Sequence, residues 1–389
     1  MTILSNYDTL NLMLIPRHYD NLDHFIKPNK VLVIFGSRQV GKTTLIRQYL
    51  TKTKFQYKLD SGDDLRVHEI LGTQEFQKII EYLSSYDLYV IDEAQRIPFI
   101  GQSLKIIVDQ VPNIKVIATG SSSFELSGQI GEPLTGRKTT LILYPVSQIE
   151  IRNIFNKSEL GERLPQFLVY GSYPAVLTVK AKQEKIELLE EIVHSYLLKD
   201  ILEIEKVKGS KVLLDLLRLI AFQIGSEVSL TELGGQLGID YKTVARYLDL
   251  LEKSFVLYNL RGFSSNLRKE IAKKSKYYFY DNGIRNAVIS NFNSLDLRDD
   301  IGKLWENFMV SERLKTQKYK NIYANNYFWR TIDKKEVDWV EESEGKLCGY
   351  EFKYQKEDKK NIAAFKKMFP DAMIKTINKD NYLDFLRVK

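Results

Sequence analysis

The sequence contains very little cysteine and histidine. Its 389 residues include a single cysteine, Cys348, so no disulfide can form within the chain and a cysteine-rich zinc or iron–sulfur site would lack its ligands. The four histidines, His18, His24, His68 and His194, are far apart, and no two have the spacing of metal ligands on one helix. These shortages exclude the usual soft-metal sites and fit a reducing compartment.

Long apolar runs and flexible linkers are also missing. No uninterrupted apolar stretch approaches the roughly 18 residues that a helix needs to cross a bilayer, and residues 1–11 have neither the early positive charge nor the apolar core of an export signal. We therefore expect a cytoplasmic protein with no membrane contact. With only 9 prolines and 21 glycines, the chain has no long Pro/Gly/Ser tract, so its domains are expected to abut closely.

The charge is only slightly unbalanced. Lysine and arginine number 57 against 50 acidic residues, a formal net charge of +7, with an isoelectric point near 9.0. A basic protein favours polyanionic partners such as nucleic acid. The excess is too small to identify such a partner by itself.

The hydrophobic pattern changes along the chain and predicts four regions. Residues 1–146 alternate short apolar runs, at 31–35, 88–91 and 116–118, with helical stretches, which is typical of a parallel α/β sheet covered by helices. Residues 147–205 predict a helical lid or connector, with an amphipathic helix at 186–204. Residues 206–300 predict three helices followed by strand-like pieces, and residues 301–389 predict a second, smaller α/β unit in the order helix, strand, hairpin strand, helix, strand.

A complete phosphate-binding motif, GSRQVGKT, follows the first apolar run and precedes a helix. Its glycines let backbone N–H groups surround phosphates, Lys42 can reach the β- and γ-phosphates, and the Thr43 hydroxyl can bind Mg²⁺. The sequence thus predicts ATP and Mg as cofactors. The expected nucleotide-binding residues are Gly36, Ser37, Arg38, Gln39, Val40, Gly41, Lys42, Thr43 and Thr44.

Acidic and hydroxyl residues follow the next two strands of this region. Asp92 and Glu93 end the apolar run LYVI, where Asp92 is expected to hold Mg²⁺ and Glu93 to orient and deprotonate the attacking water. Thr119 and Ser121 follow the run KVIA and are candidates for sensing the γ-phosphate or positioning water. Alternatively, this Ser/Gly-rich segment caps the next helix.

Arg137 lies just before another strand, and a guanidinium can stabilise charge that develops on a transferred phosphoryl group. A surface ion pair is the alternative role. The segments GSRQVGKTTLIRQ, LYVIDEAQ, ATGSSSFEL and LTGRKTTLILYPVS together resemble prokaryotic AAA-type ATPases with a C-terminal domain, relatives of archaeal and STAND-like ATPases. The resemblance implies that Lys42, Thr43, Asp92 and Glu93 bind and hydrolyse ATP. It also makes Arg137 a candidate arginine finger, and because a finger that acts in trans requires a second subunit, we expect a homo-oligomer.

A helix–turn–helix pattern follows in the third region. Ser229 and Glu232 form a capping-box pattern at the start of one helix, and a second helix over 241–251 carries Lys242 and Arg246 on one face. With the strand-like run at 255–260, this resembles a winged helix, whose second helix can enter a DNA groove. Expected DNA-binding residues are Lys242, Arg246, Arg261, Arg268 and Lys269. The same module can instead serve packing or oligomerisation.

The fourth region carries a row of polar residues on two strands joined by a Glu-Gly hairpin. Alternation along the second strand places Glu351, Lys353 and Gln355 on one face, and Asp338 lies on the neighbouring strand. The carboxylates can share Mg²⁺ while Lys353 activates water. The set resembles the PD-(D/E)xK nucleases, which implies a restriction-endonuclease-like fold and adds Glu306 as a metal ligand, although Val337 stands where that family has proline. An ordinary strand with a Glu–Lys pair is the alternative.

Together these observations predict a Mg-dependent AAA-type ATPase that couples its nucleotide state to DNA binding or processing. The competing hypothesis is a nucleotide-gated switch or scaffold that binds a protein partner or DNA without cleaving it. Glu93 and the Asp338, Glu351 and Lys353 set favour the enzyme, whereas the absence of a helicase-type motif favours the switch.

Overall fold

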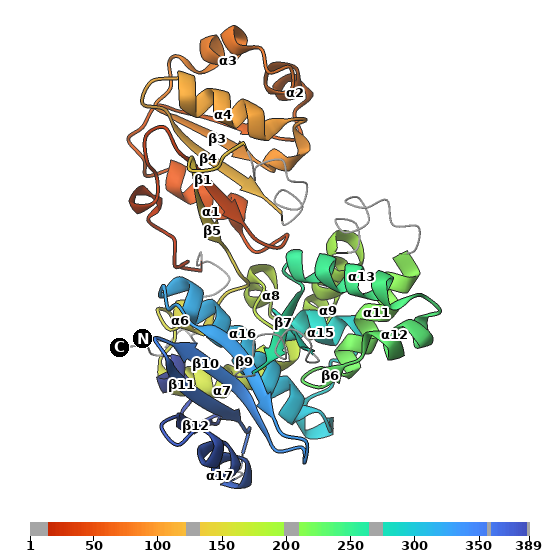
Figure 1. Cartoon of the computed structure of the whole chain (residues 1–389). Helices are drawn as coiled ribbons and strands as arrows, with labels where there is room; N and C mark the ends of the chain where they lie inside the picture. The colour runs from red at the N-terminus through yellow and green to blue at the C-terminus, as the bar shows by residue number, and fades with distance from the viewer. Residues whose placement is uncertain (1–14, 122–132, 198–209, 264–274, 356–358, 387–389) are drawn as a thin grey trace.

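The computed structural model describes residues 15–121, 133–197, 210–263, 275–355 and 359–386. Within this part of the chain, the strands form a five-stranded sheet near the N-terminus and a seven-stranded sheet built from later residues. Figure 1 shows the first sheet and its helices as one body, joined through β5 to a second body that contains the rest of the chain. The protein is therefore an α/β protein with two sheets.

The first sheet is entirely parallel, in the order β2-β3-β4-β1-β5. Because β4 lies between β1 and β3, the carboxyl end of β4 is placed between the loops that follow its two neighbours. The strands are β1 (Val31–Phe35), β2 (Tyr57–Ser61), β3 (Leu88–Asp92), β4 (Lys115–Gly120) and β5 (Lys138–Ile142). The helices are α1 (Lys42–Leu50), α2 (Leu65–Leu71), α3 (Phe76–Leu83) and α4 (Ile100–Gln110).

Strand β1 is buried on both faces, and its side chains alternate between two hydrophobic cores. Val31, Val33 and Phe35 pack with residues of α2, α3 and α4, whereas Leu32 and Ile34 pack with α1 and with residues of the second body. Burial on both faces explains the continuous apolar runs of β1, β3 and β4. Strand β2 is an edge strand with the polar sequence YKLDS, and the hydrophobic pattern did not predict it.

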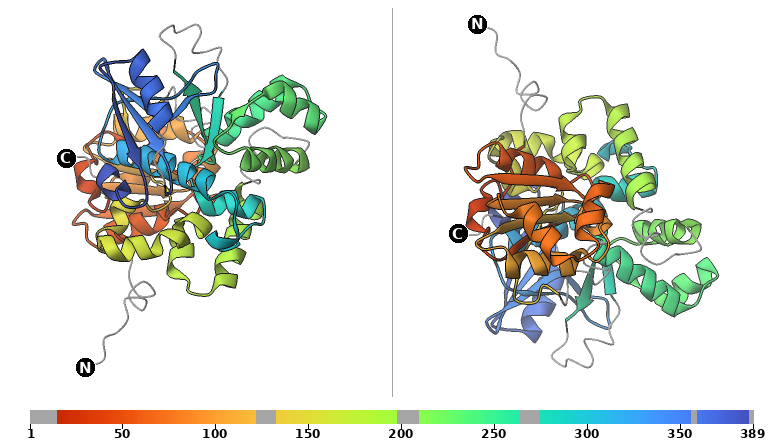
Figure 2. Two further views of the ribbon diagram at one scale, coloured as in Figure 1. Left: turned by 90° about the horizontal axis from the view of Figure 1, so that it is seen from below. Right: turned by 90° about the horizontal axis from the view of Figure 1, so that it is seen from above.

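The second sheet is mixed, in the order β12-β11-β10-β9-β7-β8-β6. Strand β7 pairs in parallel with β9, so residues on both sides of the boundary expected at 300 share one sheet. The strands are β6 (Glu227–Val228), β7 (Leu257–Gly262), β8 (Ser275–Phe279), β9 (Asn325–Arg330), β10 (Glu336–Ser343), β11 (Lys346–Phe352) and β12 (Met373–Ile377). In Figure 1 this sheet lies below the first body, and in the views of Figure 2, from below and from above, the two overlap.

The remaining helices pack against this sheet or project beside it. The helices before β6 are α6 (Gln148–Ile151), α7 (Lys157–Tyr170), α8 (Pro174–Thr178), α9 (Lys182–Glu191) and α11 (Ser210–Phe222). The later helices are α12 (Leu230–Leu237), α13 (Tyr241–Lys253), α15 (Asn282–Val288), α16 (Ile301–Tyr319), α17 (Lys359–Met368) and α18 (Tyr382–Leu386). Helices α11, α12 and α13 project to one side of the molecule in both views of Figure 2.

Several expected elements differ from those observed. The helix expected at 186–204 is divided: α9 ends at Glu191, a π-helical segment covers Ile192–Leu197, and residues 198–204 lie outside the described part. The strand expected at 255–260 begins two residues later, because Phe255 has a positive φ of 54° and closes the turn after α13. Strand β9 and helix α18 were not predicted in the C-terminal region.

None of the helices in the described ranges combines the length and the apolar character needed to span a bilayer. The absence of membrane contact otherwise stays an expectation from the sequence.

Candidate functional site at the phosphate loop

The loop between β1 and α1 has the conformation that its glycines allow. A side chain at Gly36 would place its Cβ 2.2 Å from the backbone oxygen of Leu143, so no larger residue fits there. Gly41 has φ 95° at the N-cap of α1, in the region that favours glycine. The loop thus ends at a helix N-terminus, where exposed backbone N–H groups bind phosphates.

The side chain of Lys42 is folded back onto this loop and is 4% exposed. Its Nζ donates hydrogen bonds to the backbone oxygens of Gly36 at 2.8 Å and Ser37 at 3.0 Å. The ammonium group is therefore held inside the loop, at the position from which it can reach a bound phosphate.

Three oxygen-bearing side chains from three elements meet beside the loop. The Thr43 hydroxyl, at the start of α1, donates to Asp92 Oδ2 at 2.8 Å, and the Thr119 hydroxyl, from β4, donates to Asp92 Oδ1. The strand order explains this contact, because β4 lies between β1 and β3. Thr43 and Asp92 offer the hard oxygen ligands that Mg²⁺ prefers, so the donor set fits this ion.

Glu93 immediately follows Asp92 and is fixed by its neighbours. Its backbone has φ 52°, and its N–H donates to the Thr119 hydroxyl at 3.0 Å. Its carboxylate accepts a hydrogen bond from Gln95 Nε2, which also donates to Ser121 Oγ at 3.4 Å. The structure thus places Thr119 against the Glu93 backbone and links Ser121 to Glu93 through Gln95, which the sequence analysis did not single out.

An open cavity of about 460 Å³ lies in front of these residues. Residues Arg38, Gln39, Lys42, Thr43 and Thr44 of the predicted loop line it together with Glu93. Its remaining walls were not predicted from the sequence, and they come from Arg96 and from Pro174 and Ala175 of α8. Arg96 forms an ion pair with Asp63 at the edge of this space.

A second cavity of about 190 Å³ adjoins the first, and Gly41, Thr44, Pro174 and Ala175 line both. Its other walls are Ile15, Arg17, Leu45, Gln48 and Thr178. Apolar side chains and the first turn of α1 thus extend the phosphate site toward α8. No local sequence pattern marks this cavity, because its walls come from three separate segments.

Arg17 connects the phosphate loop to the second body and is 8% exposed. Its guanidinium donates to the backbone oxygens of Val40 at 2.5 Å and Tyr144 at 2.6 Å, and forms an ion pair with Glu150 at 3.1 Å. A buried arginine that makes three such contacts fixes the position of the loop. Sequence reasoning missed it, since its partners are up to 133 residues away.

The Arg17 contacts continue into helix α16. Ser147 is the N-cap of α6 and forms a capping box with Glu150. The backbone N–H of Gln148, the first residue of α6, donates to Glu312 Oε2 at 2.6 Å. Glu312 also pairs with Lys315 at 2.8 Å, and both side chains are 1% exposed. A continuous polar path therefore joins the phosphate loop to a helix of the second body.

Arg137 lies away from the phosphate loop of its own chain. It precedes β5, and Val31 at the start of β1 donates to its backbone oxygen, so it sits at the amino edge of the sheet while the loop is at the carboxyl edge. Its guanidinium pairs with Asp109 at 2.7 Å. Arg137 is thus excluded from the site within one chain.

Three of the polar residues expected on β10 and β11 do lie together, and Lys353 is paired with both carboxylates. Lys353 Nζ is 3.4 Å from Asp338 Oδ2 and 3.2 Å from Glu351 Oε2. Gln355 is not part of the row, because β11 ends at Phe352 and Gln355 is exposed in the bend that follows. Glu306 of α16 lies 3.6 Å from a second lysine, Lys276 of β8.

This cluster differs from the metal site expected from the sequence. Among the described residues, no group of three or more Asp, Glu, His or Cys side chains is placed to hold a metal ion. Burial and the nearby Asp338 charge raise the pKa of Glu351 to about 7, and burial raises the pKa of Glu306 to about 7 despite the Lys276 charge. Asp338, Glu306 and Glu351 are therefore parts of a buried ion-pair network with two lysines.

The expected DNA-binding residues fall into two groups. Lys242 and Arg246 are exposed on α13, whose opposite face buries Val244 and Leu248, and Arg261 is exposed on β7. Arg268 and Lys269 lie outside the described residues. Lys242 and Arg246 thus belong to one of the helices that project in Figure 2, whereas Arg261 belongs to the second sheet.

Comparison with known families supports the site in part. A family model described as "AAA domain" matches residues 28–152, and two models of domains of unknown function, DUF8612 and DUF4143, match residues 161–295 and 301–382. Each model covers less than half of the chain. The chain carries an AAA-type P-loop ATPase domain followed by two regions similar to these families.

Similar proteins and structures were also found. An uncharacterized protein of Haemophilus influenzae is 26% identical over 83% of this chain and 82% of its own length, and protein Rv2008c of Mycobacterium tuberculosis is 26% identical over 83% and 70%. Protein MJ1544 of Methanocaldococcus jannaschii is 24% identical over 90% and 81%. Among solved structures, the Walker-type ATPase of Pyrococcus abyssi has a TM-score of 0.46 at 15% identity, covering 67% of this chain and 91% of its own.

Proposed function

We propose that this chain is a Mg-dependent ATP hydrolase whose nucleotide state is transmitted to its second body. The observation that carries the proposal is the contact of Thr43 with Asp92 beside the Lys42 loop, with Glu93 directly after Asp92. A loop for phosphates, two oxygen ligands for Mg²⁺ and a carboxylate for water are the parts that phosphoryl transfer to water requires.

Each residue of the site has a role in this proposal. Lys42 exchanges its two loop carbonyls for phosphate oxygens when ATP binds. Thr43 and Asp92 hold Mg²⁺, which supplies charge neutralisation on the β- and γ-phosphates. Glu93 accepts a proton from the attacking water, while Gln95 and Ser121 keep its carboxylate in place. The cavity next to α8 takes the base, which is planar and largely apolar.

The test compares wild-type protein with Glu93→Gln and Lys42→Ala in binding and hydrolysis. Glu93→Gln is expected to bind ATP and to lose about 100-fold in kcat, because the amide cannot accept the proton. Lys42→Ala is expected to lose binding as well. Binding of ATP is followed by equilibrium dialysis with labelled nucleotide, and phosphate release by a coupled assay. Wild-type turnover in Glu93→Gln would remove this residue from the mechanism.

A polar path supports the proposal that the nucleotide state reaches the second body. This path runs from Val40 through Arg17, Glu150 and Gln148 to Glu312. A phosphate bound in the loop contacts the same stretch of backbone to which Arg17 is hydrogen-bonded. A shift of this backbone is therefore passed through Arg17 and α6 to α16. Coupling of this kind needs two arrangements of the path that the nucleotide distinguishes.

We further propose that α13 contacts DNA phosphates, as a winged helix does. Support comes from the exposed Lys242 and Arg246 on the face opposite the buried Val244 and Leu248. The double variant K242A/R246A is expected to weaken duplex binding and to lower the salt slope by about 2, one per phosphate contact. Lys253→Ala is the matched control, since this lysine pairs with Asp249 on the same helix. An unchanged salt slope would assign α13 to packing.

The second candidate function is a switch that binds its partner without cutting it. It is favoured by the ion pairs of Lys276 with Glu306 and of Lys353 with Asp338 and Glu351, which engage the carboxylates that a nuclease would use to hold its metal ion. Intact linear and circular DNA after incubation with protein, ATP and Mg²⁺ would support the switch. Cleavage that disappears in Asp338→Ala would instead support a PD-(D/E)xK-type nuclease.

A further inference from the structure

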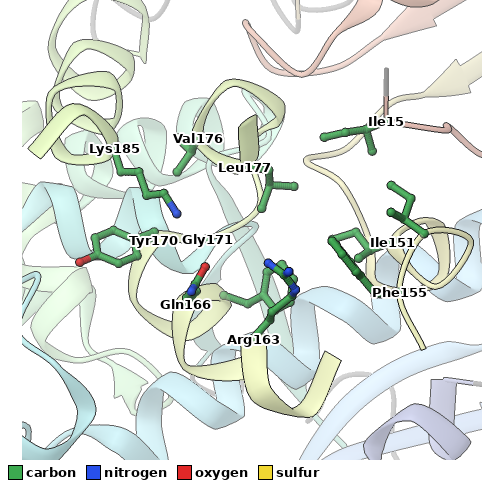
Figure 3. Close-up of a pocket in the computed structure, with 12 residues that line it drawn as sticks. Ile15, Ile151, Phe155, Arg163, Gln166, Tyr170, Gly171, Val176, Leu177 and Lys185 are labelled. Carbon is green, nitrogen blue, oxygen red and sulfur yellow. The ribbon is translucent and has the colours of Figure 1, made fainter. Parts of the chain in front are cut away.

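Cationic side chains line several cavities beside α8, but these cavities differ in the room that they offer. Arg163 and Lys185 line the cavity in Figure 3, among α7, α8 and α9, and its volume of about 30 Å³ admits only a water molecule or two. The cavity assigned to the phosphates is far larger, about 460 Å³. Its lining includes Arg38 and Lys42 of the loop and also Arg96, which lies outside the loop. Arg96 is therefore a cation at a site large enough for a ligand, although it does not belong to the predicted motif.

Arg96 belongs to the same turn as the proposed water-activating Glu93. Glu93 is the N-cap of the 3-10 helix Ala94–Arg96, and the Arg96 N–H donates to the Glu93 backbone oxygen at 3.1 Å. The side chains of both residues line the cavity together with Lys42 and Thr43. A guanidinium and a carboxylate thus enter the phosphate site from one short turn after β3.

A cation at the γ-phosphate is required because the negative charge of this group must be neutralised while water attacks it. Arg137 cannot supply that cation within one chain, since it lies at the opposite edge of the sheet. Arg38 is part of the loop, so its position follows the loop backbone. Arg96 comes from the turn that carries Glu93, where the attacking water is expected. Its guanidinium therefore approaches the γ-phosphate from the side of the water.

In the structure, the Arg96 guanidinium is held by Asp63. Arg96 Nη1 donates to Asp63 Oδ1, and the two side chains are 43% and 55% exposed. The position of Asp63 is fixed by the preceding Gly62, whose N–H donates to the Asp92 backbone oxygen at 2.7 Å. A Cβ at Gly62 would lie 2.1 Å from the Glu93 backbone oxygen, so the loop after β2 packs directly on the Glu93 turn. Because an exposed ion pair contributes little to stability, a phosphate can replace Asp63 at small cost.

We propose that Arg96 binds the γ-phosphate of ATP within its own chain, and that Asp63 holds the guanidinium at the edge of the site until ATP binds. The inference rests on the proposed function and adds a residue to its site. ADP has no γ-phosphate, so Arg96 remains on Asp63 in the ADP complex. A guanidinium can form two hydrogen bonds to one phosphate, and it therefore contributes to affinity as well as to charge neutralisation.

The reaction that Arg96 assists is the transfer of the γ-phosphoryl group to water. The water oxygen bonds to the γ-phosphorus, while the bond between this phosphorus and the β–γ bridging oxygen breaks. The water gives one proton to Glu93, and ADP leaves with the bridging oxygen and its electron pair, so the other product is inorganic phosphate. Negative charge develops on the phosphoryl and bridging oxygens during this step, and the Arg96 guanidinium neutralises part of it.

The first experiment measures nucleotide affinity, so it does not depend on hydrolysis. The full chain is dialysed against labelled ADP, or against the imido analogue of ATP, in which NH replaces the β–γ bridging oxygen. Arg96→Ala is expected to weaken binding of the analogue about tenfold, the loss of a charge-assisted contact, and to leave ADP affinity within roughly twofold. Retained ADP binding also shows that the variant is folded.

Two further variants separate phosphate binding from a structural role of the ion pair. Asp63→Asn is expected to strengthen binding of the analogue about threefold, because Arg96 no longer has to leave a carboxylate. Arg66→Ala removes an exposed arginine that pairs with the neighbouring Asp64, and this matched control should change neither affinity. If Arg96→Ala and Asp63→Asn weaken both nucleotides alike, the pair only maintains the turn and the proposal is wrong.

Hydrolysis tests whether Arg96 acts within one chain. Arg96→Ala is expected to lower kcat about 100-fold, and Arg96→Lys to recover part of the loss, because lysine restores the charge without the planar fork. A mixture of Arg96→Ala with Lys42→Ala should give no more turnover than the two proteins measured separately, since each site needs both residues from the same chain. A gain on mixing would place Arg96 at a neighbouring site and overturn the assignment.

The binding results distinguish failure of the Arg96 role from failure of the proposed function. If the wild-type chain binds ADP and the analogue, and Arg96→Ala binds the analogue equally well, the nucleotide site stands and the role of Arg96 is wrong. If the wild-type chain binds neither nucleotide, the proposed function fails and Arg96 has no phosphate to bind.

Discussion

At the scale of single residues, the proposed water-activating Glu93 depends on side chains that do not themselves react. Gln95 Nε2 contacts the Glu93 carboxylate and the Ser121 hydroxyl, and Thr119 bonds both the Glu93 backbone and Asp92. Glu93 lies in a left-handed turn with φ 52°, where its direction depends on such contacts. Positioning of this kind affects kcat more than binding.

We predict that Gln95→Ala lowers kcat for ATP hydrolysis about tenfold and leaves KM within roughly twofold, because the carboxylate loses its orientation while the phosphate loop is intact. Steady-state phosphate release over a range of ATP concentrations measures both constants. Gln110→Ala, an exposed glutamine at the end of α4, is the control. A change in KM with constant kcat would place Gln95 in binding instead.

The buried carboxylates of the second body lead to a prediction on pH. The folded protein raises the pKa of Glu351 from 4.5 to about 7, so between these values the folded state binds more protons at Glu351 than the unfolded state. The contribution of Glu351 to the free energy of unfolding therefore falls as pH rises through this window.

We compare the free energy of unfolding of Glu351→Gln with that of wild type. This difference is expected to shift by about 1 to 2 kcal/mol in favour of the variant from pH 5 to pH 8, since the amide cannot ionise. Urea unfolding of both proteins at the two pH values gives the difference. Glu344→Gln, in the exposed hairpin turn of the same sheet, should show no such change. A gain that is the same at both pH values would contradict the shifted pKa.

At the scale of elements, short helices connect the two bodies. α6 has four residues and α8 has five, yet α6 bonds Arg17 on one side and Glu312 on the other. Helices this short are marginal in isolation, so tertiary contacts maintain them. Buried polar groups at such junctions are costly when one partner is removed.

Arg17→Met is predicted to lower the free energy of unfolding by about 3 to 5 kcal/mol, because Glu150 is left buried without its cation. It should also weaken ATP binding through the loss of the Val40 contact. Chemical denaturation and dialysis measure the two effects. Arg66→Met, which breaks an exposed pair with Asp64, should leave stability nearly unchanged. If both variants behave alike, the Arg17 path has no structural role.

At the scale of the whole molecule, the position of Arg137 bears on assembly. It lies at the amino edge of the first sheet, opposite its own phosphate loop, and its side chain is 39% exposed. Arg137 can therefore assist hydrolysis only in a neighbouring chain. We accordingly propose a homo-oligomer in which this residue completes the site of the adjacent copy.

This arrangement predicts complementation between two inactive variants. Lys42→Ala and Arg137→Ala should each have low turnover, and a mixture should exceed both, because the intact loop of one chain meets the intact arginine of the other. A mixture of Lys42→Ala with Glu93→Gln is the control, since both changes disable the same half of the site. Full activity of Arg137→Ala alone would leave the arginine as the partner of Asp109 only.

The sequence by itself determined the phosphate loop, the Asp92–Glu93 pair and the α/β character of the first region. These features are local: a motif of eight residues, an apolar run that is buried on both faces, and a helix that begins at Lys42. The pairing of Thr43 with Asp92 followed from the motif because parallel strands end at one edge of the sheet.

Only the tertiary structure decided the features that depend on distant segments. Arg17 reaches the phosphate loop and Glu150, α8 lines both cavities beside that loop, and β7 joins β9 across the boundary expected at 300. The Asp338, Glu351 and Lys353 cluster shows the difference most clearly, since strand alternation brought its residues together but the packing of Lys276 and Lys353 determined its charges. Contacts between segments far apart in sequence leave no periodic or motif signal, because they arise only when the sheets pack.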